Sequence, residues 1–550
     1  MIAQLPLADT TSSATARCRW FLLACTLLAL ALRLPLLGRS VWFDEACMAG
    51  QRIGTFEQLI ATLYVDIHPP LFVTFMHGWG RLFGDGEFAL RLPALLAGLA
   101  AIPLTYWTGH RLVGATAARW ATVLLALSPV HIWYSAEARL YAPMIACTLL
   151  LFGTVDRLLT EGAHRRLLML VHVTNVVVML GMHYYLAVIV GVLALAAPML
   201  AGGFTRRARR VLLWHGIGLS LLGVFLVGKF AVGHFETSQD YLRALTLQGL
   251  SQFLLDWCWT GHTLLPAEVP TLTAIAWTQQ GLGALLLLLG FVAVVRTRQH
   301  QPRGFLVLVG LFTLPAFLWL CAQLGYDRTY MERSMLPALP FVFLLAGAGL
   351  ATLRGKAQPL VGVATLALNV AALIGLFTFH TTHWTVYKPN SDWRSAAAWL
   401  GEEIDRDGAG RPVFTSTPNP RSLCYYDPRI QDVKNLALPM APEQLAAAIE
   451  KRLGSWLGQV AINTFRTFAA HNDSLLKAAK LRVYRCSADP AKLDLAARGK
   501  DDICYLVRDE WHPHRTVDSS VEDLLDSPRI QLLASQRFAG VQVHKVRVLP

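Results

Sequence analysis

Apolar segments of about twenty residues recur through the first 380 residues of this 550-residue chain. A segment of that length crosses a hydrocarbon core of about 30 Å as an α-helix. The chain is 54% hydrophobic and only 15% charged, whereas soluble proteins carry about 25% charged residues. The pattern therefore predicts an α-helical polytopic membrane protein and argues against a soluble one.

About eleven segments are predicted to span the membrane. They cover residues 20–37, 89–110, 115–134, 139–158, 166–181, 184–202, 211–232, 272–295, 304–324, 334–353 and 357–379. The first follows Arg17 and Arg19, and no small-x-small cleavage site accompanies it. We therefore interpret it as a membrane anchor and not as a signal peptide.

The short loops between these segments are basic. They comprise residues 111–119, 157–166, 206–210, 296–303 and 354–356. If every segment crosses once, these loops share one side with Arg17 and Arg19, and the positive-inside tendency makes that side cytoplasmic. The C-terminus is then outside. The net charge is +13, and the basic residues cluster in short loops, where they orient the chain on insertion into the membrane. Nucleic acid is therefore not an expected partner.

Residues 69–83 form a shorter apolar segment that begins with Pro69-Pro70 and contains His77 and two glycines. Counting this segment as a crossing would move three basic loops to the outside. We therefore predict a juxtamembrane or re-entrant helix here.

The composition changes after Phe379, where apolar runs stop and charges become dense. Ser391 is predicted to cap an amphipathic helix over residues 391–404. Strand-like runs follow at 412–415, 459–462, 481–484, 503–507 and 541–548, and helix-like runs at 443–453 and 521–525. This alternation predicts a small α/β domain over 381–550, beside a transmembrane domain over 1–380.

Ionisable and aromatic residues collect in the segments that this topology places outside. The candidate site residues are Asp44, Glu45, His68, Glu137, Arg139, Tyr141, His183, Tyr184, Arg328, Glu332 and Arg333. Each also has an ordinary interpretation. Asp44 and Glu45 would be solvated helix caps, Glu137 and Arg139 would neutralise each other, and His183 and its neighbours would pack in the core. The outer arginines would contact lipid phosphates non-specifically.

Together these residues bring acids, histidines and arginines from at least five segments to one membrane face. Ionisable groups at such a boundary are costly and usually mark a site. Arginine binds phosphate through bidentate donors and a fixed charge, and a carboxylate suits deprotonation of an incoming hydroxyl or amine. A lipid-linked phosphosugar would use both kinds of group.

Three motifs resemble the bacterial branch of the protein O-mannosyltransferase family: FDEA (43–46), HPPLFVTFMHGWGRLFGDGEFALRLPALLAG (68–98) and YSAEARLYA (134–142). These proteins are membrane glycosyltransferases of the GT-C type, related to the aminoarabinose transferases that modify lipid A. Two further stretches are similar to the ERY-LLPALP element and to the opening of the family's periplasmic domain. They are ERSMLPALP (332–340) and KPNSDWRSAAAWL (388–400). The resemblance covers most of the first 200 residues well, residues 325–400 fairly and the rest poorly.

The resemblance implies transfer from a polyprenyl-monophosphate sugar, with inversion at the anomeric carbon, at the periplasmic face of a bacterial inner membrane. It implies that Asp44 is the general base and that Glu45 is its partner in the family's DE pair. His68 would lie near the donor phosphate, and Arg328 and Arg333 would hold that phosphate. The family's acidic-aromatic patch corresponds to Glu137, Arg139 and Tyr141.

The family's usual ERY reads Glu332-Arg333-Ser334 here, so an aromatic hydroxyl is missing. The nine cysteines show no CxxC spacing, and no three-carboxylate cage is evident. No cofactor is expected, although dependence on a divalent metal stays open. The alternative function is a transporter or flippase of lipid-linked sugars, but the inverted repeats and midplane helix breaks common in transporters are not evident. The motifs define neither the sugar nor the acceptor, which is a lipid, a glycan or a protein.

Overall fold

The computed structural model describes residues 12–53, 59, 63, 68–160, 165–232, 242–261, 270–297, 302–378, 391–407, 411–415, 421–432, 443, 447, 450, 462–463, 466, 469–470, 481–485, 502–509, 521 and 524–549. The chain divides into two compact units. The first comprises Met1–Leu37, Arg91–Ser220 and Ser238–Thr378, and the second comprises Gly38–Leu90, Leu221–Thr237 and Phe379–Pro550.

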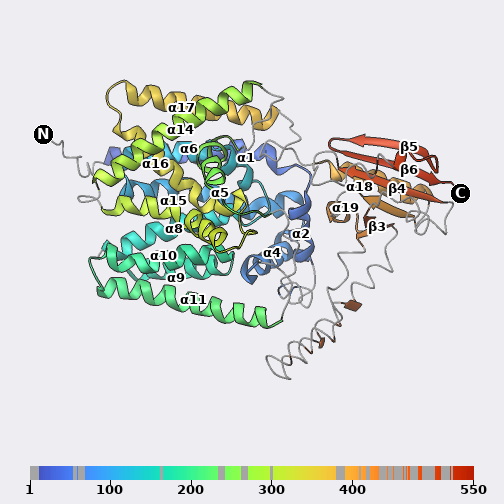
Figure 1. Cartoon of the computed structure of the whole chain (residues 1–550), viewed down its shortest axis with the longest axis horizontal. Helices are drawn as coiled ribbons and strands as arrows, with labels where there is room; N and C mark the ends of the chain where they lie inside the picture. Colours follow the sequence, from blue (N-terminus) through green and yellow to red (C-terminus); the bar gives the residue numbers. More distant parts are fainter. Residues whose placement is uncertain are drawn as a thin grey trace. The chain divides into compact units, whose positions relative to one another are not determined.

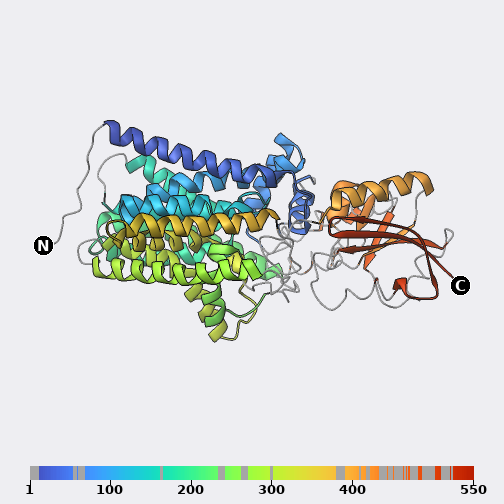
Figure 2. The same cartoon turned by 90° about the horizontal axis from the view of Figure 1, so that it is seen from above.

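The first unit is a bundle of apolar helices (Figure 1 and Figure 2). The elements that lie in it wholly or in part are α1 (Ser12–Leu37), α5 (Glu87–Leu112), α6 (Ala115–Ala126), α7 (Pro129–Ser135), α8 (Tyr141–Thr160), α9 (Arg165–Leu180), α10 (Tyr184–Leu200), α11 (Arg206–Val232), α12 (Leu247–Gln252), the π-helix η1 (Phe253–Trp257), α13 (Cys258–Thr260), α14 (Pro270–Thr297), α15 (Phe305–Gln323), the 3-10 helices η2 (Pro302–Gly304) and η3 (Glu332–Ala338), α16 (Leu339–Thr352) and α17 (Ala357–Thr378). Among the described residues, eight helices are long and apolar enough to cross a membrane. Helices α9 and α10 are also apolar but shorter. The predicted polytopic helical class is confirmed, while the number of about eleven spans stays a prediction.

The segment 115–134, which hydropathy predicts as one span, forms two helices. α6 ends at Ala126 and α7 begins at Pro129. Ser128 caps α7, because its hydroxyl accepts a hydrogen bond from the backbone N–H of His131 at 3.3 Å. Proline has no N–H to donate to the preceding turn, so it suits the first position of a new helix and not the interior of a longer one.

Two glycines allow the helix backbones of the first unit to approach closely. A Cβ atom at Gly290 of α14 would lie 1.9 Å from the carbonyl oxygen of Leu345 in α16. A Cβ atom at Gly347 of α16 would lie 2.3 Å from the carbonyl oxygen of Ala117 in α6. Small residues permit this kind of contact between membrane helices, so α16 packs tightly against two neighbours.

We expect Gly290→Val to destabilise the protein by about 1–3 kcal/mol, because the valine side chain fits only if α14 and α16 separate. Gly281→Val in the same helix is a matched control, since a Cβ atom there meets nothing within 4 Å. Thermal unfolding in detergent should give a clearly lower midpoint for Gly290→Val than for Gly281→Val. Equal midpoints would contradict the close packing.

The second unit contains a sheet of six strands within the described residues, in the order β2-β3-β1-β4-β6-β5. They are β1 (Pro412–Thr415), β2 (Ile430–Asp432), β3 (Leu481–Arg485), β4 (Ile503–Asp509), β5 (Ile530–Phe538) and β6 (Val541–Val548). β3 pairs in parallel with β2 and β1, and β1 pairs in parallel with β4. β6 pairs antiparallel with β4 and β5. The sheet is therefore mixed, with its antiparallel part at the C-terminal end.

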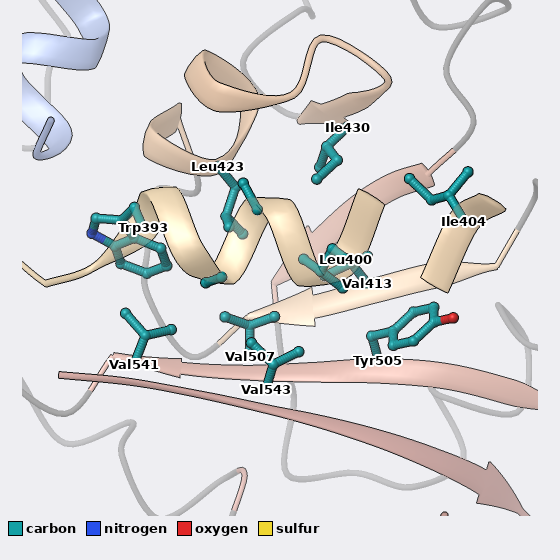
Figure 3. Packing of buried hydrophobic residues seen from close by; sticks show 12 residues of the cluster. Trp393, Leu400, Ile404, Val413, Leu423, Ile430, Tyr505, Val507, Val541 and Val543 are labelled. Atoms are coloured by element: carbon teal, nitrogen blue, oxygen red, sulfur yellow. The ribbon is translucent and has the colours of Figure 1, made fainter. Parts of the chain in front are cut away.

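Buried hydrophobic side chains lie on both faces of this sheet. Helices α18 (Trp393–Asp407) and α19 (Arg421–Tyr426) cover one face (Figure 3). The core on that side consists of Trp393, Ala396, Ala397, Leu400, Ile404, Val413, Leu423, Ile430, Tyr505, Val507, Val541 and Val543. Along β4, Tyr505 belongs to this core, while Cys504 and Leu506 belong to the core of the opposite face, as the two-residue period of a strand requires.

The predicted α/β domain is confirmed, with strands at 412–415, 481–484, 503–507 and 541–548. The sequence pattern does not predict β2, which has only three residues, or β5, whose side chains are mostly exposed. The helix predicted from Ser391 is α18, but its cap is Asp392, whose Oδ1 accepts a hydrogen bond from the backbone N–H of Ser395 at 3.1 Å. The runs predicted at 443–453, 459–462 and 521–525 lie largely outside the described residues.

Two helices of the segment Gly38–Leu90 pack against each other in the second unit: α2 (Phe43–Ile53) and α4 (Pro70–Phe83). α4 is the helix predicted over 69–83. It begins at Pro70, directly after the extended backbone of Pro69 (φ −61°, ψ 157°). The predicted position of α4 beside the membrane stays a prediction.

Candidate active site

Three of the predicted site residues meet in the first unit around the ring of Tyr141. The guanidinium carbons of Arg139 and Arg333 each lie 5.7 Å from the centroid of that ring. The ring of Tyr134 meets it edge-on, with 5.1 Å between centroids. Arg139 and Tyr141 are buried, and Arg333 is half-buried. Residues from α7, the loop after it, α8 and η3 are thereby brought together.

The turn between α7 and α8 positions Glu137 and Arg139. α7 ends at Ser135 and α8 begins at Tyr141. Within the turn, the backbone N–H of Arg139 donates a hydrogen bond to the carbonyl oxygen of Glu137 at 2.7 Å. The Glu137 residue is only 2% exposed. A buried acid and a buried guanidinium in one short turn are costly and usually mark a functional site in a membrane protein.

Glu332 forms an ion pair with an arginine that is not among the predicted site residues. Arg243 donates a hydrogen bond to the Glu332 carboxylate in an ion pair. The backbones of Arg243 and Tyr330 also exchange two hydrogen bonds, at 3.1 and 2.8 Å. Arg243 is the one lysine or arginine in residues 233–271. That isolation in a predicted outer segment is the signal that could have identified it.

Tyr330, whose backbone pairs with that of Arg243, is almost fully buried. Burial raises the pKa of the Tyr330 hydroxyl, and the nearby Glu332 carboxylate raises it further. Tyr330 is therefore a neutral hydroxyl at any physiological pH. The guanidinium carbon of Arg243 lies 5.5 Å from the Tyr330 ring, so the arginine contacts both the acid and the ring.

A second unanticipated feature is the π-helix η1, which carries Trp257. The Trp257 ring lies 6.0 Å from Tyr134 and 5.6 Å from Phe253 between centroids. Single π-turns inside helices occur frequently at functional sites. With Tyr134 and Tyr141, Trp257 continues a row of aromatic rings beside the arginines.

His183 and Tyr184 lie at the start of α10. The ring Nδ1 of His183 caps that helix by accepting a hydrogen bond from the backbone N–H of Tyr185 at 3.1 Å. Tyr185 donates its hydroxyl proton to the carbonyl oxygen of Thr329 at 2.5 Å. Tyr185 therefore links the start of α10 to the loop before η3, while the predicted role of Tyr184 stays a prediction. Arg328, in that loop, is exposed.

The predicted residues Asp44, Glu45 and His68 belong to the second unit. Asp44 and Glu45 lie in the first turn of α2. Glu45 is 1% exposed, and its Oε2 accepts a hydrogen bond from the backbone N–H of Trp42 at 3.4 Å. Asp44 is half-buried. The two acids therefore differ: Glu45 is committed to the start of its helix, and Asp44 is the more accessible.

His68 is half-buried and lies two residues before α4, which packs on α2. The candidate residues are therefore divided between the two units. The first unit contains Glu137, Arg139, Tyr141, His183, Tyr184, Arg328, Glu332 and Arg333, and the second contains Asp44, Glu45 and His68. Among the described residues, no three His, Cys, Asp or Glu side chains come together in a group that could hold a metal ion.

Comparison with known proteins identifies one family. Residues 67–227 match the family of dolichyl-phosphate-mannose-protein mannosyltransferases. This range includes His68, the 135–140 turn and α10. No curated protein sequence matches the chain.

Several solved structures are similar. The crystal structure of ArnT from Cupriavidus metallidurans in the apo state has 12% sequence identity and a TM-score of 0.52, and the match covers 97% of this chain and 98% of ArnT. ArnT bound to undecaprenyl phosphate has 15% identity, a TM-score of 0.47 and the same coverage. The archaeal oligosaccharyltransferase AglB from Archaeoglobus fulgidus has 11% identity and a TM-score of 0.47, with 91% of this chain and 70% of AglB covered.

The likeness to apo ArnT extends over nearly the whole of both chains. At this identity it shows a shared fold. The family match lies in the helical part, where two of the three sequence motifs are also found. The family match over residues 67–227 and the shared fold both make this chain similar to membrane glycosyltransferases of the GT-C type.

Proposed function

We propose that this protein transfers a sugar from a polyprenyl-monophosphate carrier to a hydroxyl or amine of a lipid, glycan or protein acceptor. The reaction takes place at the outer face of a bacterial cytoplasmic membrane, and the C-terminal domain lies in the periplasm. The family match, whose description names a dolichyl-phosphate sugar donor, supports a lipid-linked donor. The basic loops that the topology places inside support the sidedness.

The observation that carries the proposal is the pair of guanidinium groups over Tyr141. Stacking on an aromatic ring orients a planar guanidinium. Two arginines oriented in this way suit the oxygens of a phosphate, to which arginine donates paired hydrogen bonds. A sugar phosphate is the substrate class that needs both these donors and the neighbouring aromatic rings.

The local charge balance also favours an anion. The group contains the guanidiniums of Arg139, Arg243 and Arg333 and the carboxylates of Glu137 and Glu332. Among these five described residues, three positive and two negative charges leave a formal charge of about +1, and the Arg243–Glu332 pair accounts for one charge of each sign. Opposite charges stabilise a buried ion, so a phosphate monoester is favoured over a neutral ligand. In this proposal the guanidiniums neutralise the negative charge of the leaving phosphate, and a divalent metal is not required.

Asp44 acts as the general base. Its carboxylate accepts the proton from the acceptor hydroxyl or amine as that group attacks the anomeric carbon. The bond from the anomeric carbon to the carrier phosphate breaks on the opposite side, so the configuration inverts and the polyprenyl phosphate leaves with the bonding electrons. Asp44 suits this role because Glu45 is buried and bonded to the start of α2, whereas Asp44 is half-buried. His68 contributes a donor to the carrier phosphate.

Mass spectrometry of glycolipids and glycoproteins from cells that lack the protein tests this function. We expect one class of molecule to lose the mass of a single sugar residue, while its lipid-linked donor accumulates. Restoring the gene should restore the mass, and restoring the Asp44→Asn variant should not. Unchanged glycans together with a donor trapped on the cytoplasmic side would instead favour a flippase.

A further inference from the structure

The hydroxyl of Tyr426, in α19 of the C-terminal domain, bonds to both ends of the segment that carries Asp44. It accepts a hydrogen bond from the backbone N–H of Val41 at 2.6 Å and another from the hydroxyl of Ser40 at 3.3 Å. It donates its own proton to the carboxylate of Glu87, near the end of the segment. A tyrosine hydroxyl has one proton and two lone pairs, so all three are used.

Arg394, in the first turn of α18, makes a second set of bonds to the same two places. Its guanidinium donates to both oxygens of the Glu87 carboxylate, with Nε 3.2 Å from Oε1, and to the carbonyl oxygen of Gly38 at 2.9 Å. Its backbone N–H donates to the hydroxyl of Ser40 at 3.2 Å. Tyr426 and Arg394 therefore share Glu87 and Ser40. With Val41 and Gly38, these residues form one connected network within the second unit.

This network ends where α2 begins. Val41 is the last residue before Trp42, whose carbonyl oxygen accepts the first helical bond, from the backbone N–H of Ala46 at 2.9 Å. Asp44 lies in the first turn of that helix. Because α2 is short and starts at a fixed point, the hydrogen bond to Val41 sets the place and direction from which the Asp44 side chain leaves the backbone.

The environment of Tyr426 keeps the network intact over the working pH range. Burial raises the pKa of the Tyr426 hydroxyl to about 12, and its hydrogen bond to Glu87 contributes to that rise. The hydroxyl therefore stays protonated at neutral pH and continues to donate to the Glu87 carboxylate. Arg394, whose pKa is raised chiefly by its hydrogen bond to Glu87, stays charged.

We propose that Tyr426, with Glu87 and Arg394, is a positioning residue for the catalytic base: the C-terminal domain holds the start of α2 so that Asp44 is placed for proton transfer. The inference rests on the proposed function, in which Asp44 is that base. It gives the C-terminal domain a role in the reaction rate that does not depend on contact between this domain and either substrate.

Tyr426→Phe tests the proposal in the full-length protein. The change removes one hydroxyl and keeps the ring, so the bonds to Val41, Ser40 and Glu87 are lost together. Misplacing a catalytic group by about 1 Å can cost up to 10²-fold in rate. We expect kcat to fall by about 10-fold or more, with the KM for the lipid-linked donor unchanged, because the arginines that bind the donor phosphate are not part of this network.

Tyr425→Phe is the matched control. Tyr425 is the preceding residue of α19 and also bonds to the segment, since its hydroxyl donates to the carbonyl oxygen of Asp85 at 2.6 Å. That contact involves neither Ser40 nor Val41 at the start of α2, so kcat should stay near the wild-type value. Equal kcat values for the two variants would overturn the proposal, as would a Tyr426→Phe variant that changes only the donor KM.

A second variant separates positioning from folding. Glu87→Gln keeps an oxygen that can accept from Tyr426 and weakens the ion pair with Arg394, so it should lower kcat less than Tyr426→Phe at a similar thermal midpoint. If Tyr426 acts through Asp44, Tyr426→Phe should also reduce the residual rate of Asp44→Asn much less than it reduces the wild-type rate. Equal reductions in both backgrounds would contradict the role.

The same experiments distinguish two kinds of failure. If Asp44→Asn transfers sugar at the wild-type rate, the proposed base is wrong and the inference falls with it. If Asp44→Asn is inactive while Tyr426→Phe is fully active, only the positioning role is wrong and the proposed function stands.

Discussion

Asp44→Asn is expected to reduce sugar transfer by about 10³-fold, within the range that general-base catalysis contributes. Asparagine has nearly the same shape as aspartate but cannot accept the proton of the attacking hydroxyl or amine. Binding of the lipid-linked donor should remain close to that of the wild type, because the phosphate is bound by arginines. Transfer and donor binding would be measured separately on purified protein in detergent.

Asp85→Asn is the control for this experiment. Asp85 is an exposed acid of the same Gly38–Leu90 segment, and its side chain has no part in the proposed reaction. The same change there should leave the rate near that of the wild type. Transfer by Asp44→Asn at the wild-type rate would show that Asp44 is not the base.

Arg333→Ala is expected to weaken binding of the donor by about 30-fold, which corresponds to about 2 kcal/mol for hydrogen bonds to a charged group. The reason is that the guanidiniums of Arg333 and Arg139 both lie over the Tyr141 ring, and we assign both of them to the phosphate. Arg333→Lys keeps the charge but loses the planar pair of donors, so it should give an intermediate affinity. The measurement is equilibrium binding of a polyprenyl-phosphate sugar.

Arg328→Ala provides the comparison, since Arg328 precedes Arg333 by only five residues and is exposed. An exposed arginine in water contributes less to a phosphate contact than a half-buried one. We expect a smaller loss of affinity for Arg328→Ala than for Arg333→Ala. The reverse order would move the phosphate site into the loop before η3.

The helical class and several strands could be predicted because they depend on local patterns. Apolar runs of about twenty residues specify membrane helices whatever their neighbours are. Most side chains of β4 and β6 are buried, whereas β5 is a mostly exposed strand at the edge of the sheet. Such an edge strand carries little hydrophobic signal, and its pairing with β6 determines it instead.

The break between α6 and α7 was hidden because hydropathy is continuous across it. Ser128 and Pro129 are the local signal, since serine before proline is typical of a helix start. The same two residues would also fit a kink inside one helix. Only the cap hydrogen bond to His131 decides between these cases.

The candidate site could be predicted in part. The motifs led to Arg139, Tyr141 and Arg333, which the structure describes in one group in the first unit. The partner of Glu332 could not be found in this way, because Arg243 is 89 residues away in the chain. The contact between Ser40 and Tyr426 spans 386 residues. Contacts at such separation depend on the folded chain and leave no periodic pattern in the sequence.

The most direct test of the central claim is the acceptor-dependent release of polyprenyl monophosphate by the purified protein. The protein would be incubated with a polyprenyl-monophosphate sugar and membrane acceptor fractions, and the free lipid phosphate and the glycosylated product would be quantified by mass spectrometry. We predict equal amounts of both from the wild type and about 10³-fold less of each from Asp44→Asn in the same time. Glycosylated product without release of the lipid phosphate, or equal release by the two proteins, would contradict the account.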